Sequence, residues 1–227
     1  MSLPRLSGPS DPLLLSTPIG EDVYPPSEDT YLMLDTIAEN TLETSGEDWR
    51  FTFSLEVGSG SGVLSSFLLD RLAPLPRFAI AVDLNPLACK QTVGTASRVG
   101  VGALLDVVCC DFTKGQCFRK GVFNVVICNP PYVPGEDREF TLETGGEDIL
   151  EKSWNGGGPF GREVPLKILH SIFSLVTYSR ILFLFEKRND VGFVLEKVSN
   201  MREGLAIRKL RESRCRGEEL YVYEIRS

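Results

Sequence analysis

The tetrapeptide Asn129-Pro130-Pro131-Tyr132 carries the clearest chemical signal in the sequence. A proline has no N–H donor and a fixed backbone torsion, so the two prolines leave the Pro130 carbonyl rigid and free to accept a hydrogen bond. The side-chain oxygen of Asn129 can accept a second hydrogen bond, and Tyr132 adds a flat apolar wall. The segment therefore predicts a clamp of two acceptors for an –NH₂ group.

Such a clamp suits a substrate nitrogen whose lone pair is delocalised, as in an amide or an aryl amine. Hydrogen bonds donated to Asn129 and Pro130 would hold the group and return electron density to the nitrogen. Catalysis then becomes mainly a matter of aligning this nitrogen with an incoming carbon. We expect Asn129, Pro130 and Tyr132 to be the catalytic residues.

A glycine-rich loop predicts a ligand site beside the clamp. The loop contains Gly58 and Gly60 and follows an apolar run that ends at Glu56. Glycines in such a turn permit positive φ and let the backbone approach a ligand closely. Because Gly-x-Gly-x-Gly differs from the dinucleotide fingerprint, the loop alone does not identify the ligand.

Acidic residues at the next two strand ends narrow the choice of ligand. Asp83 ends one predicted strand, where a carboxylate can accept hydrogen bonds from both hydroxyls of a ribose. Asp111 ends the next, where it can meet an adenine amino group while Phe112 covers a ring face. These features imply an adenosine-containing ligand. Since Glu56 also suits a cationic amino-acid tail, S-adenosylmethionine fits better than NAD.

The elements that position these residues alternate between strand and helix, which predicts a doubly wound parallel sheet in a three-layer α/β sandwich. Two strands in succession at the end of the chain, joined by about eight residues, predict an antiparallel hairpin at one edge and a seven-stranded sheet in all. Hydrophobic periodicity and capping signals predict helices over 28–43, 62–72, 86–98, 163–176 and 190–201, strands over 51–57, 77–83, 104–109, 122–128, 180–185, 205–210 and 219–225, and an irregular segment over 129–160.

Composition places the chain among ordinary globular proteins. The 227 residues suffice for one sizeable domain, which we assign to 20–227, preceded by a flexible segment over 1–19. A net charge of -7 argues against a generic nucleic-acid binder. Neither a signal peptide nor a membrane span is apparent in the sequence, so we expect a cytoplasmic protein, with the nucleus as an alternative.

The cysteines and the single histidine exclude several kinds of site. None of the six cysteines forms a Cys-x-x-Cys pair, and His170 is the only histidine. We therefore expect no metal site, no histidine-dependent catalytic triad, and cysteines that are reduced and mostly buried.

These motifs resemble the Asn-Pro-Pro-Tyr branch of class I S-adenosylmethionine-dependent methyltransferases. Outside the tetrapeptide, the chain is similar to the short eukaryotic and archaeal members of the HemK glutamine methyltransferases, which modify class I translation release factors. The resemblance covers roughly residues 20–225 and rests on Tyr24–Thr30, Leu55–Val63, Asp83–Pro86, Asn129–Val133, Trp154–Gly157 and Gly161–Glu163.

The resemblance implies a substrate, a cofactor and a partner. It implies methylation of the N5 nitrogen of glutamine in the Gly-Gly-Gln motif of a release factor, and a small zinc-binding activator subunit. In the family's strand order, the strand over 104–109 lies at the sheet edge and offers that partner a place to pair. The cofactor contacts that the resemblance and the glycine loop imply are Thr30, Glu56, Gly58, Gly60, Asp83, Asp111, Phe112 and Asn129.

Two departures from the family pattern stand out. The separate N-terminal helical domain of the bacterial enzymes has no counterpart before residue 20, and Pro159-Phe160 are inserted between the glycines and Gly161.

Other functions share the same clamp. A lysine methyltransferase acting on histone tails and an adenine-N6 nucleic-acid methyltransferase remain alternatives, and so does an inactive scaffold that binds S-adenosylmethionine. Residues 136–151 hold seven acidic residues and one arginine, which disfavours phosphate and favours a basic protein surface. The intact tetrapeptide disfavours the scaffold.

Overall fold

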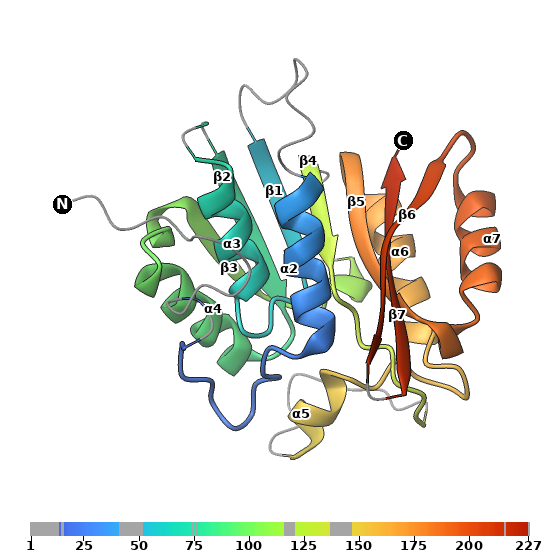
Figure 1. The fold of residues 1–227 in the computed structure, drawn as a ribbon, viewed down its shortest axis with the longest axis horizontal. Coiled ribbons are helices and arrows are strands. Elements are labelled where there is room, and N and C mark those ends of the chain that lie inside the picture. Colours follow the sequence, from blue (N-terminus) through green and yellow to red (C-terminus); the bar gives the residue numbers. More distant parts are fainter. Residues whose placement is uncertain are drawn as a thin grey trace.

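The computed structural model describes residues 14, 16–40, 52–73, 75, 77–115, 121–136, 147–215 and 217–226. In these ranges the chain forms one sheet of seven strands in the order β3-β2-β1-β4-β5-β7-β6. β1 to β5 run parallel, whereas β7 is antiparallel to both β5 and β6. The predicted fold class, the terminal hairpin and the edge position of β3 are thereby confirmed (Figure 1).

The elements follow one another in the predicted alternation. The helices are α2 (Glu28–Asn40), α3 (Val63–Arg71), α4 (Pro86–Arg98), α5 (Glu147–Lys152), α6 (Glu163–Leu175) and α7 (Val191–Met201), with single 3₁₀ turns η1 (Gly102–Leu104), η2 (Phe112–Lys114) and η3 (Lys187–Asn189). The strands are β1 (Thr52–Val57), β2 (Arg77–Asp83), β3 (Leu105–Cys109), β4 (Gly121–Cys128), β5 (Val176–Glu186), β6 (Ala206–Cys215) and β7 (Glu218–Arg226). None of the described helices is both long and apolar enough to cross a membrane.

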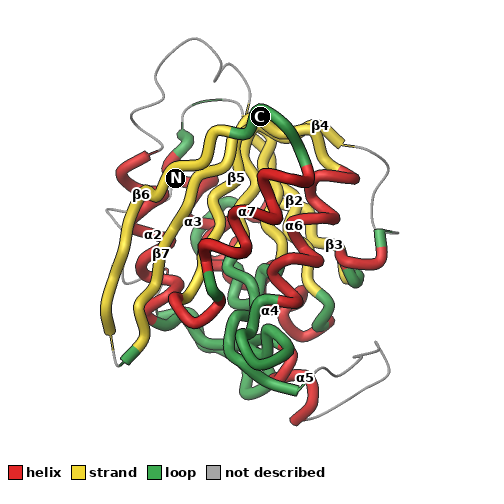
Figure 2. Tube along the Cα trace, turned by 90° about the vertical axis from the view of Figure 1, so that its right-hand side faces the viewer, coloured by secondary structure: helices red, strands yellow, loops and turns green. Residues whose placement is uncertain are grey.

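Helices cover both faces of the sheet, and each face has its own hydrophobic core. α2, α3 and α4 pack on one face around buried residues such as Leu34 and Phe67. α6 and α7 pack on the other face around residues such as Leu169 and Val194 (Figure 2). Residues 125–128 of β4 and 181–185 of β5 are buried from both sides, which is why these two stretches are continuously apolar.

A capping residue and a proline fix the start of α4, which follows the site residue Asp83. Asn85 caps α4 by accepting a hydrogen bond from the Leu87 N–H at 2.9 Å, and Pro86 occupies the first turn, where its missing donor costs nothing. The bounds predicted for β2 and α4 agree with the structure, because cap, proline and apolar period point to the same residues.

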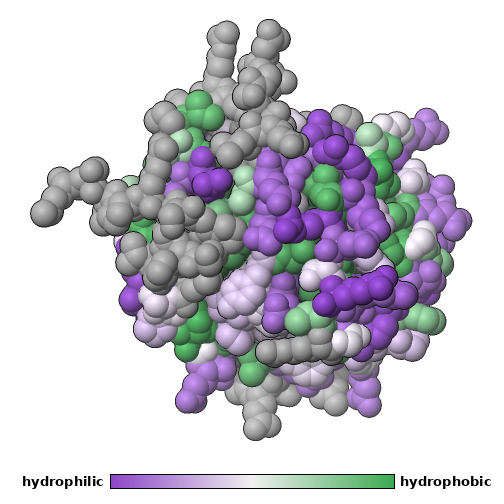
Figure 3. All heavy atoms as spheres, viewed as in Figure 1, coloured by the Kyte–Doolittle hydropathy of each residue, from purple (hydrophilic) through white to green (hydrophobic). Residues whose placement is uncertain are grey.

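The terminal hairpin is longer and tighter than predicted. β6 extends to Cys215, and the connection to β7 is short rather than about eight residues. The hydrophobic pattern did not predict the polar end of β6, because this strand is an exposed edge, where polar and apolar side chains need not alternate. Arg211 of β6 pairs instead with Asp35, at 3.1 Å, and Glu39 of α2. Hydrophilic side chains accordingly cover much of this face over α2 and the hairpin (Figure 3).

Several further expectations fail. The segment 129–160, predicted to be irregular, contains the short helix α5, and β5 begins at Val176 rather than at Arg180. The expectation of reduced cysteines fails at Cys110, which lies just beyond β3 and is disulfide-bonded. The other described cysteines, Cys89, Cys109, Cys128 and Cys215, are free thiols. Only Cys128 among these four is buried, so the expectation of mostly buried cysteines is wrong for them.

Gly62 is a glycine on which the packing of α3 against α4 depends. It begins α3 with φ of +74°, and a Cβ there would lie 2.5 Å from the Cα of Thr92 in α4. We expect Gly62→Ala to lower the free energy of unfolding by about 1–3 kcal/mol, because it adds left-handed strain to a clash with backbone. Gly94→Ala is the matched control, since its Cβ would enter open space on exposed α4. It should be neutral or stabilise by up to about 1 kcal/mol. Equal denaturation midpoints for both variants would contradict this.

Candidate active site

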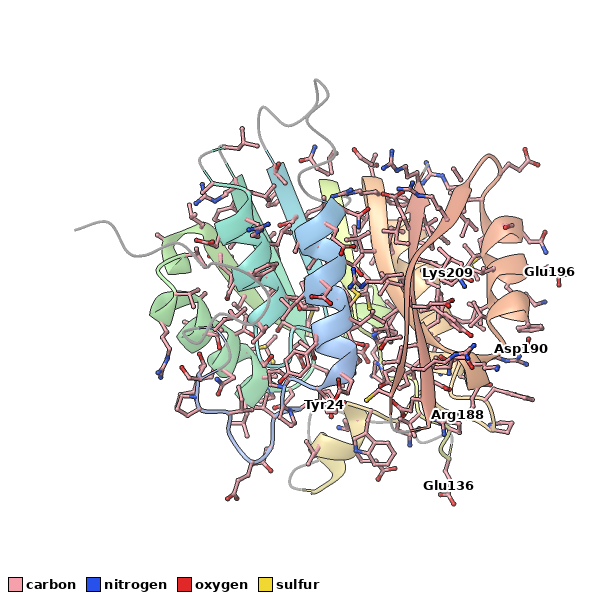
Figure 4. All side chains as sticks on the ribbon, in the orientation of Figure 1. Tyr24, Glu136, Arg188, Asp190, Glu196 and Lys209 are labelled. Atoms are coloured by element: carbon pink, nitrogen blue, oxygen red, sulfur yellow. The ribbon has the colours of Figure 1, made fainter. Side chains whose placement is uncertain are left out.

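Two adjoining cavities lie at the carboxyl ends of the parallel strands, where open α/β sheets bind their ligands. Their volumes are about 360 Å³ and about 310 Å³. The residues that line both are Tyr24, Gly58, Gly60, Asp83, Pro131 and Ser153. Tyr24 and Arg188 both lie at this end of the sheet (Figure 4).

The structure brings every predicted site residue to these cavities. Asp111 and Phe112 line the first cavity, which we call the β2–β3 cavity. The second, which we call the clamp cavity, is lined by Thr30, Glu56, Asn129, Pro130 and Tyr132. The roles assigned to these residues stay predictions, whereas their convergence from separate segments is a structural finding.

The glycine loop and Asp83 are joined by hydrogen bonds. Gly58 and Gly60 have φ of +78° and +50°, which explains the need for glycine there. The Asp83 carboxylate accepts hydrogen bonds from the N–H groups of Gly60 and Asn85, both at 2.8 Å. Burial raises the pKa of Asp83, while these backbone donors oppose the rise. Asp83 thus fixes the loop and still faces the cavity.

Asp111 has a structural task as well as its predicted one. Its carboxylate caps the turn η2 by accepting from the N–H of Thr113 at 3.0 Å and from its hydroxyl at 2.6 Å. Lys114 lies 3.7 Å from the same carboxylate. Phe112 is buried in the core beneath α6 and also lines the β2–β3 cavity. Capping holds both residues at the cavity, so the two interpretations are compatible.

Glu56 is a buried acid at the junction of strand, loop and helix. Its carboxyl accepts hydrogen bonds from the N–H of Ser65, at 3.0 Å, and from the Ser65 hydroxyl. Burial raises the pKa of Glu56 to about 8, and the charge of Asp83 adds to the rise. The carboxyl is therefore mainly protonated at neutral pH. A cation in the clamp cavity would favour its ionised form.

The clamp itself has an unsatisfied acceptor. The side-chain oxygen of Asn129 is buried and has no hydrogen-bond partner within the described part of the chain. A buried acceptor without a partner costs about 1–3 kcal/mol, so its presence beside a cavity points to a ligand that donates to it. Pro130 and Pro131, which follow, have no N–H that could fill the position.

Tyr132 is held as a neutral donor. Its hydroxyl lies 3.3 Å from an Asp29 oxygen and 3.4 Å from a Glu218 oxygen. Burial raises the pKa of Tyr132 far above its usual range, and the charge of Asp29 raises it further. A hydroxyl that stays protonated is unsuited to act as a base, and the role of Tyr132 as a flat wall of the site stays a prediction.

The segment that follows α5 contributes residues to the site that the sequence analysis did not name as site residues. Val133 donates to the Trp154 carbonyl at 2.9 Å, and its own carbonyl accepts from the Gly156 N–H at 2.9 Å. This pairing brings Ser153 and Trp154 to the clamp cavity, where Trp154 is 37% exposed and therefore accessible to a substrate. Trp154 belonged to the family resemblance, which was the only signal that could have found it.

Asp29, Tyr24 and Glu218 were also missed as site residues. Asp29 accepts from the hydroxyl of Tyr24 at 3.4 Å and from the N–H of Thr30 at 2.6 Å. Tyr24 and Asp29 stand within the segment before α2 and its first turn, beside the predicted Thr30. Glu218 comes from the start of β7, and no local pattern could place it there.

Sheet order, strand-end site and clamp together define a class I methyltransferase. A solved structure with a similar fold is that of the Mtq2–Trm112 complex of E. cuniculi, responsible for methylation of the translation termination factor eRF1. Its matching chain is 24% identical, with a TM-score of 0.61 over 91% of this chain and 99% of the other. No protein-family model matches the chain.

Curated relatives give the family. Methyltransferase HEMK2 of Mus musculus is 36% identical over 166 residues, which are 70% of this chain and 71% of the relative. The eRF1 methyltransferase catalytic subunit mtq2 of Schizosaccharomyces pombe is 25% identical over 93% of this chain and 96% of the relative. The chain belongs to the HEMK2 family of methyltransferases, which confirms the predicted resemblance and enzyme class.

The raised pKa of Glu56 predicts how stability depends on pH. Because the pKa is about 8 in the folded protein and 4.5 is its ordinary value, folding favours the protonated form. Stability from this group is complete below its ordinary value and is lost as the pH rises through the folded pKa. Glu56→Gln removes the titration. We expect the free energy of unfolding of the wild type, relative to Glu56→Gln, to fall between about pH 5 and about pH 8. Urea titrations that give a constant difference would contradict this.

Proposed function

We propose that this protein transfers a methyl group from S-adenosylmethionine to the side-chain amide nitrogen of a glutamine. The acceptor would be the glutamine of the Gly-Gly-Gln motif in a class I translation termination factor. One observation carries the proposal: the buried, unpartnered side-chain oxygen of Asn129 at the clamp cavity, which Pro130 also lines. An amide –NH₂ has two N–H groups and can satisfy both acceptors.

The side chains around the two cavities suit the parts of S-adenosylmethionine. Asp83 can accept from the ribose hydroxyls, and Asp111 and Phe112 can hold the adenine in the β2–β3 cavity. Thr30 and Glu56 lie at the clamp cavity, where they can hold the amino-acid end. The ammonium group there would favour the ionised form of Glu56. The bound cofactor supplies an electrophilic methyl group.

The protein's own groups then mainly position the acceptor. Hydrogen bonds to Asn129 and Pro130 fix the amide nitrogen and push electron density onto it. Because the amide proton becomes acidic only as the new bond forms, no strong base is needed, which agrees with the raised pKa of Tyr132. Tyr132 and Trp154 flank the cavity with flat surfaces that suit a planar amide.

The choice of acceptor protein rests on family membership and on the resemblance to HemK glutamine methyltransferases. The acidic segment 136–151 was expected to meet a basic protein surface, but most of it lies outside the described residues. Because translation termination is a cytoplasmic process, we propose a cytoplasmic location, with the nucleus as the alternative.

A lysine acceptor is the second candidate. Asp29 and Glu218 place carboxylates beside Tyr132 at the clamp cavity, and these would attract an ammonium group. Methyl transfer from labelled S-adenosylmethionine to a release factor, a histone tail and DNA, measured side by side, separates the candidates. Transfer to the release factor supports the proposal. Transfer to the tail or DNA alone, or to none of them, would overturn it in favour of the lysine, adenine or scaffold alternative.

The edge strand β3 supports a partner subunit. Among the strands that the structure describes, β3 pairs only with β2, so its outer side can accept a further strand. The sequence Leu105-Asp106-Val107-Val108-Cys109 contains no lysine or proline to discourage pairing. We propose a heterodimer in which a small zinc-binding activator adds to this edge, in keeping with the complex of the E. cuniculi protein.

Asn129→Ala should abolish most of the activity. We expect the rate to fall about 100- to 1000-fold, the scale for removal of one electrostatic clamp group. The affinity for S-adenosylmethionine, measured by calorimetry, should fall much less. Asn124→Ala is the matched control, since Asn124 binds the Phe53 N–H at the opposite end of the sheet. Near-full turnover of Asn129→Ala on every acceptor would show that the clamp mechanism is wrong.

The exposed edge of β3 predicts behaviour on expression. The chain alone should be poorly soluble, and co-expression with a small zinc-binding activator should give a soluble complex of one copy each. Light scattering coupled to size exclusion measures the outcome. A soluble and fully active monomer at micromolar concentration would contradict this prediction.

A further inference from the structure

The side chain of Asn189 makes several hydrogen-bond contacts with backbone, one of them to the clamp residue Tyr132. It ends the turn η3, directly after β5, and its side chain is fully buried. Its amide nitrogen lies 2.8 Å from the carbonyl oxygens of Tyr132 and Phe160, and 3.2 Å from that of Gly161. Its amide oxygen accepts from the Glu186 N–H at 2.8 Å. Both ends of one side-chain amide are therefore engaged with backbone.

The clamp needs such an external support. Pro130 and Pro131 have no N–H groups, so this stretch of backbone cannot be fixed by donors of its own. The Tyr132 carbonyl, which comes next, is held by Asn189. Gly161 has φ of +64°, and a Cβ there would lie 2.1 Å from the same Tyr132 oxygen. The two backbone segments are thus in direct contact, and the Asn189 amide joins them.

The support continues into the sheet. Glu186 is 2% exposed, and its carboxylate accepts from the backbone N–H and the side-chain Nε of Arg188, both at 2.8 Å. The same carboxylate approaches the Glu219 N–H at 3.4 Å, and the neighbouring Glu218 contacts the hydroxyl of Tyr132. The end of β5, the start of β7 and the clamp consequently form one connected unit.

We propose that Asn189 is a positioning residue for methyl transfer. It fixes the Tyr132 carbonyl and, through it, the direction of the acceptors on Pro130 and Asn129. It also binds the carbonyls of Phe160 and Gly161, and so fixes the segment 154–161, which begins with Trp154 at the clamp cavity. Asn189 touches neither acceptor nor cofactor in this scheme. The inference rests on the proposed function and assigns that site a residue outside its motifs.

Asn189→Ala tests the inference against Asn124→Ala. Both variants remove a side-chain amide that binds backbone, but Asn124 lies at the far end of the sheet. Asn189→Ala should lower kcat on the acceptor by about 10- to 100-fold, because small displacements of a positioned group are costly. Its affinity for S-adenosylmethionine should change by less than about twofold, since Asn189 lines neither of the two cavities. A kcat near that of the wild type, or an equal loss in Asn124→Ala, would overturn the inference.

Hydrogen–deuterium exchange gives a readout that does not need activity. Asn189→Ala should speed exchange at the amides of Val133 and Gly156, which join the clamp to the loop. Asn124→Ala should leave them protected, and unchanged protection in Asn189→Ala would count against the inference. If the wild-type complex transfers no methyl group to any acceptor, the proposed function fails, while this measurement still decides whether Asn189 holds the clamp.

Asn189→Asp covers the case in which the alanine variant does not fold. It keeps the size and the acceptor for Glu186, but its ionised carboxylate would face carbonyl oxygens. Burial raises the pKa of such a carboxyl, and its protonated form can again donate one hydrogen bond. Activity relative to the wild type should therefore rise as the pH falls from about 8 to about 6. A ratio that stays constant over this range would contradict the positioning role.

Discussion

A backbone segment that cannot secure itself is the constraint on which this site depends. In the proposed function the Pro130 carbonyl accepts a hydrogen bond from the substrate, and the two consecutive prolines also lack the N–H donors that would tie the segment to its neighbours. The surrounding structure supplies the missing support: Asn189 binds the Tyr132 carbonyl, and Asp29 and Glu218 lie at the Tyr132 hydroxyl. Residues distant in sequence therefore hold the clamp in place.

The parallel sheet explains why ligand residues from separate segments meet beside this clamp. Glu56, Asp83 and Asp111 each stand at or just after the carboxyl end of a strand, and neighbouring parallel strands bring these ends together. Their carboxyls also have local structural tasks, since each accepts backbone hydrogen bonds at a turn or helix start. In the proposed function, structure and ligand binding therefore use the same groups.

The sequence predicted what local signals determine. β2 and α4 were found with their bounds because an apolar run, a cap and a proline coincide there, and the site residues lay at predictable strand ends. The end of β6 was missed because its side chains form ion pairs with α2 instead of alternating. The contacts of Trp154 and Asn189 arise from long-range pairing, which no local pattern encodes.

The most direct test of this account is a crystal structure of the protein with S-adenosylhomocysteine and a glutamine-containing Gly-Gly-Gln peptide. The account predicts that the glutamine amide nitrogen lies about 2.7–3.2 Å from both the Asn129 side-chain oxygen and the Pro130 carbonyl oxygen. A glutamine bound elsewhere, with the Asn129 oxygen still unpartnered or occupied by another group, would contradict it.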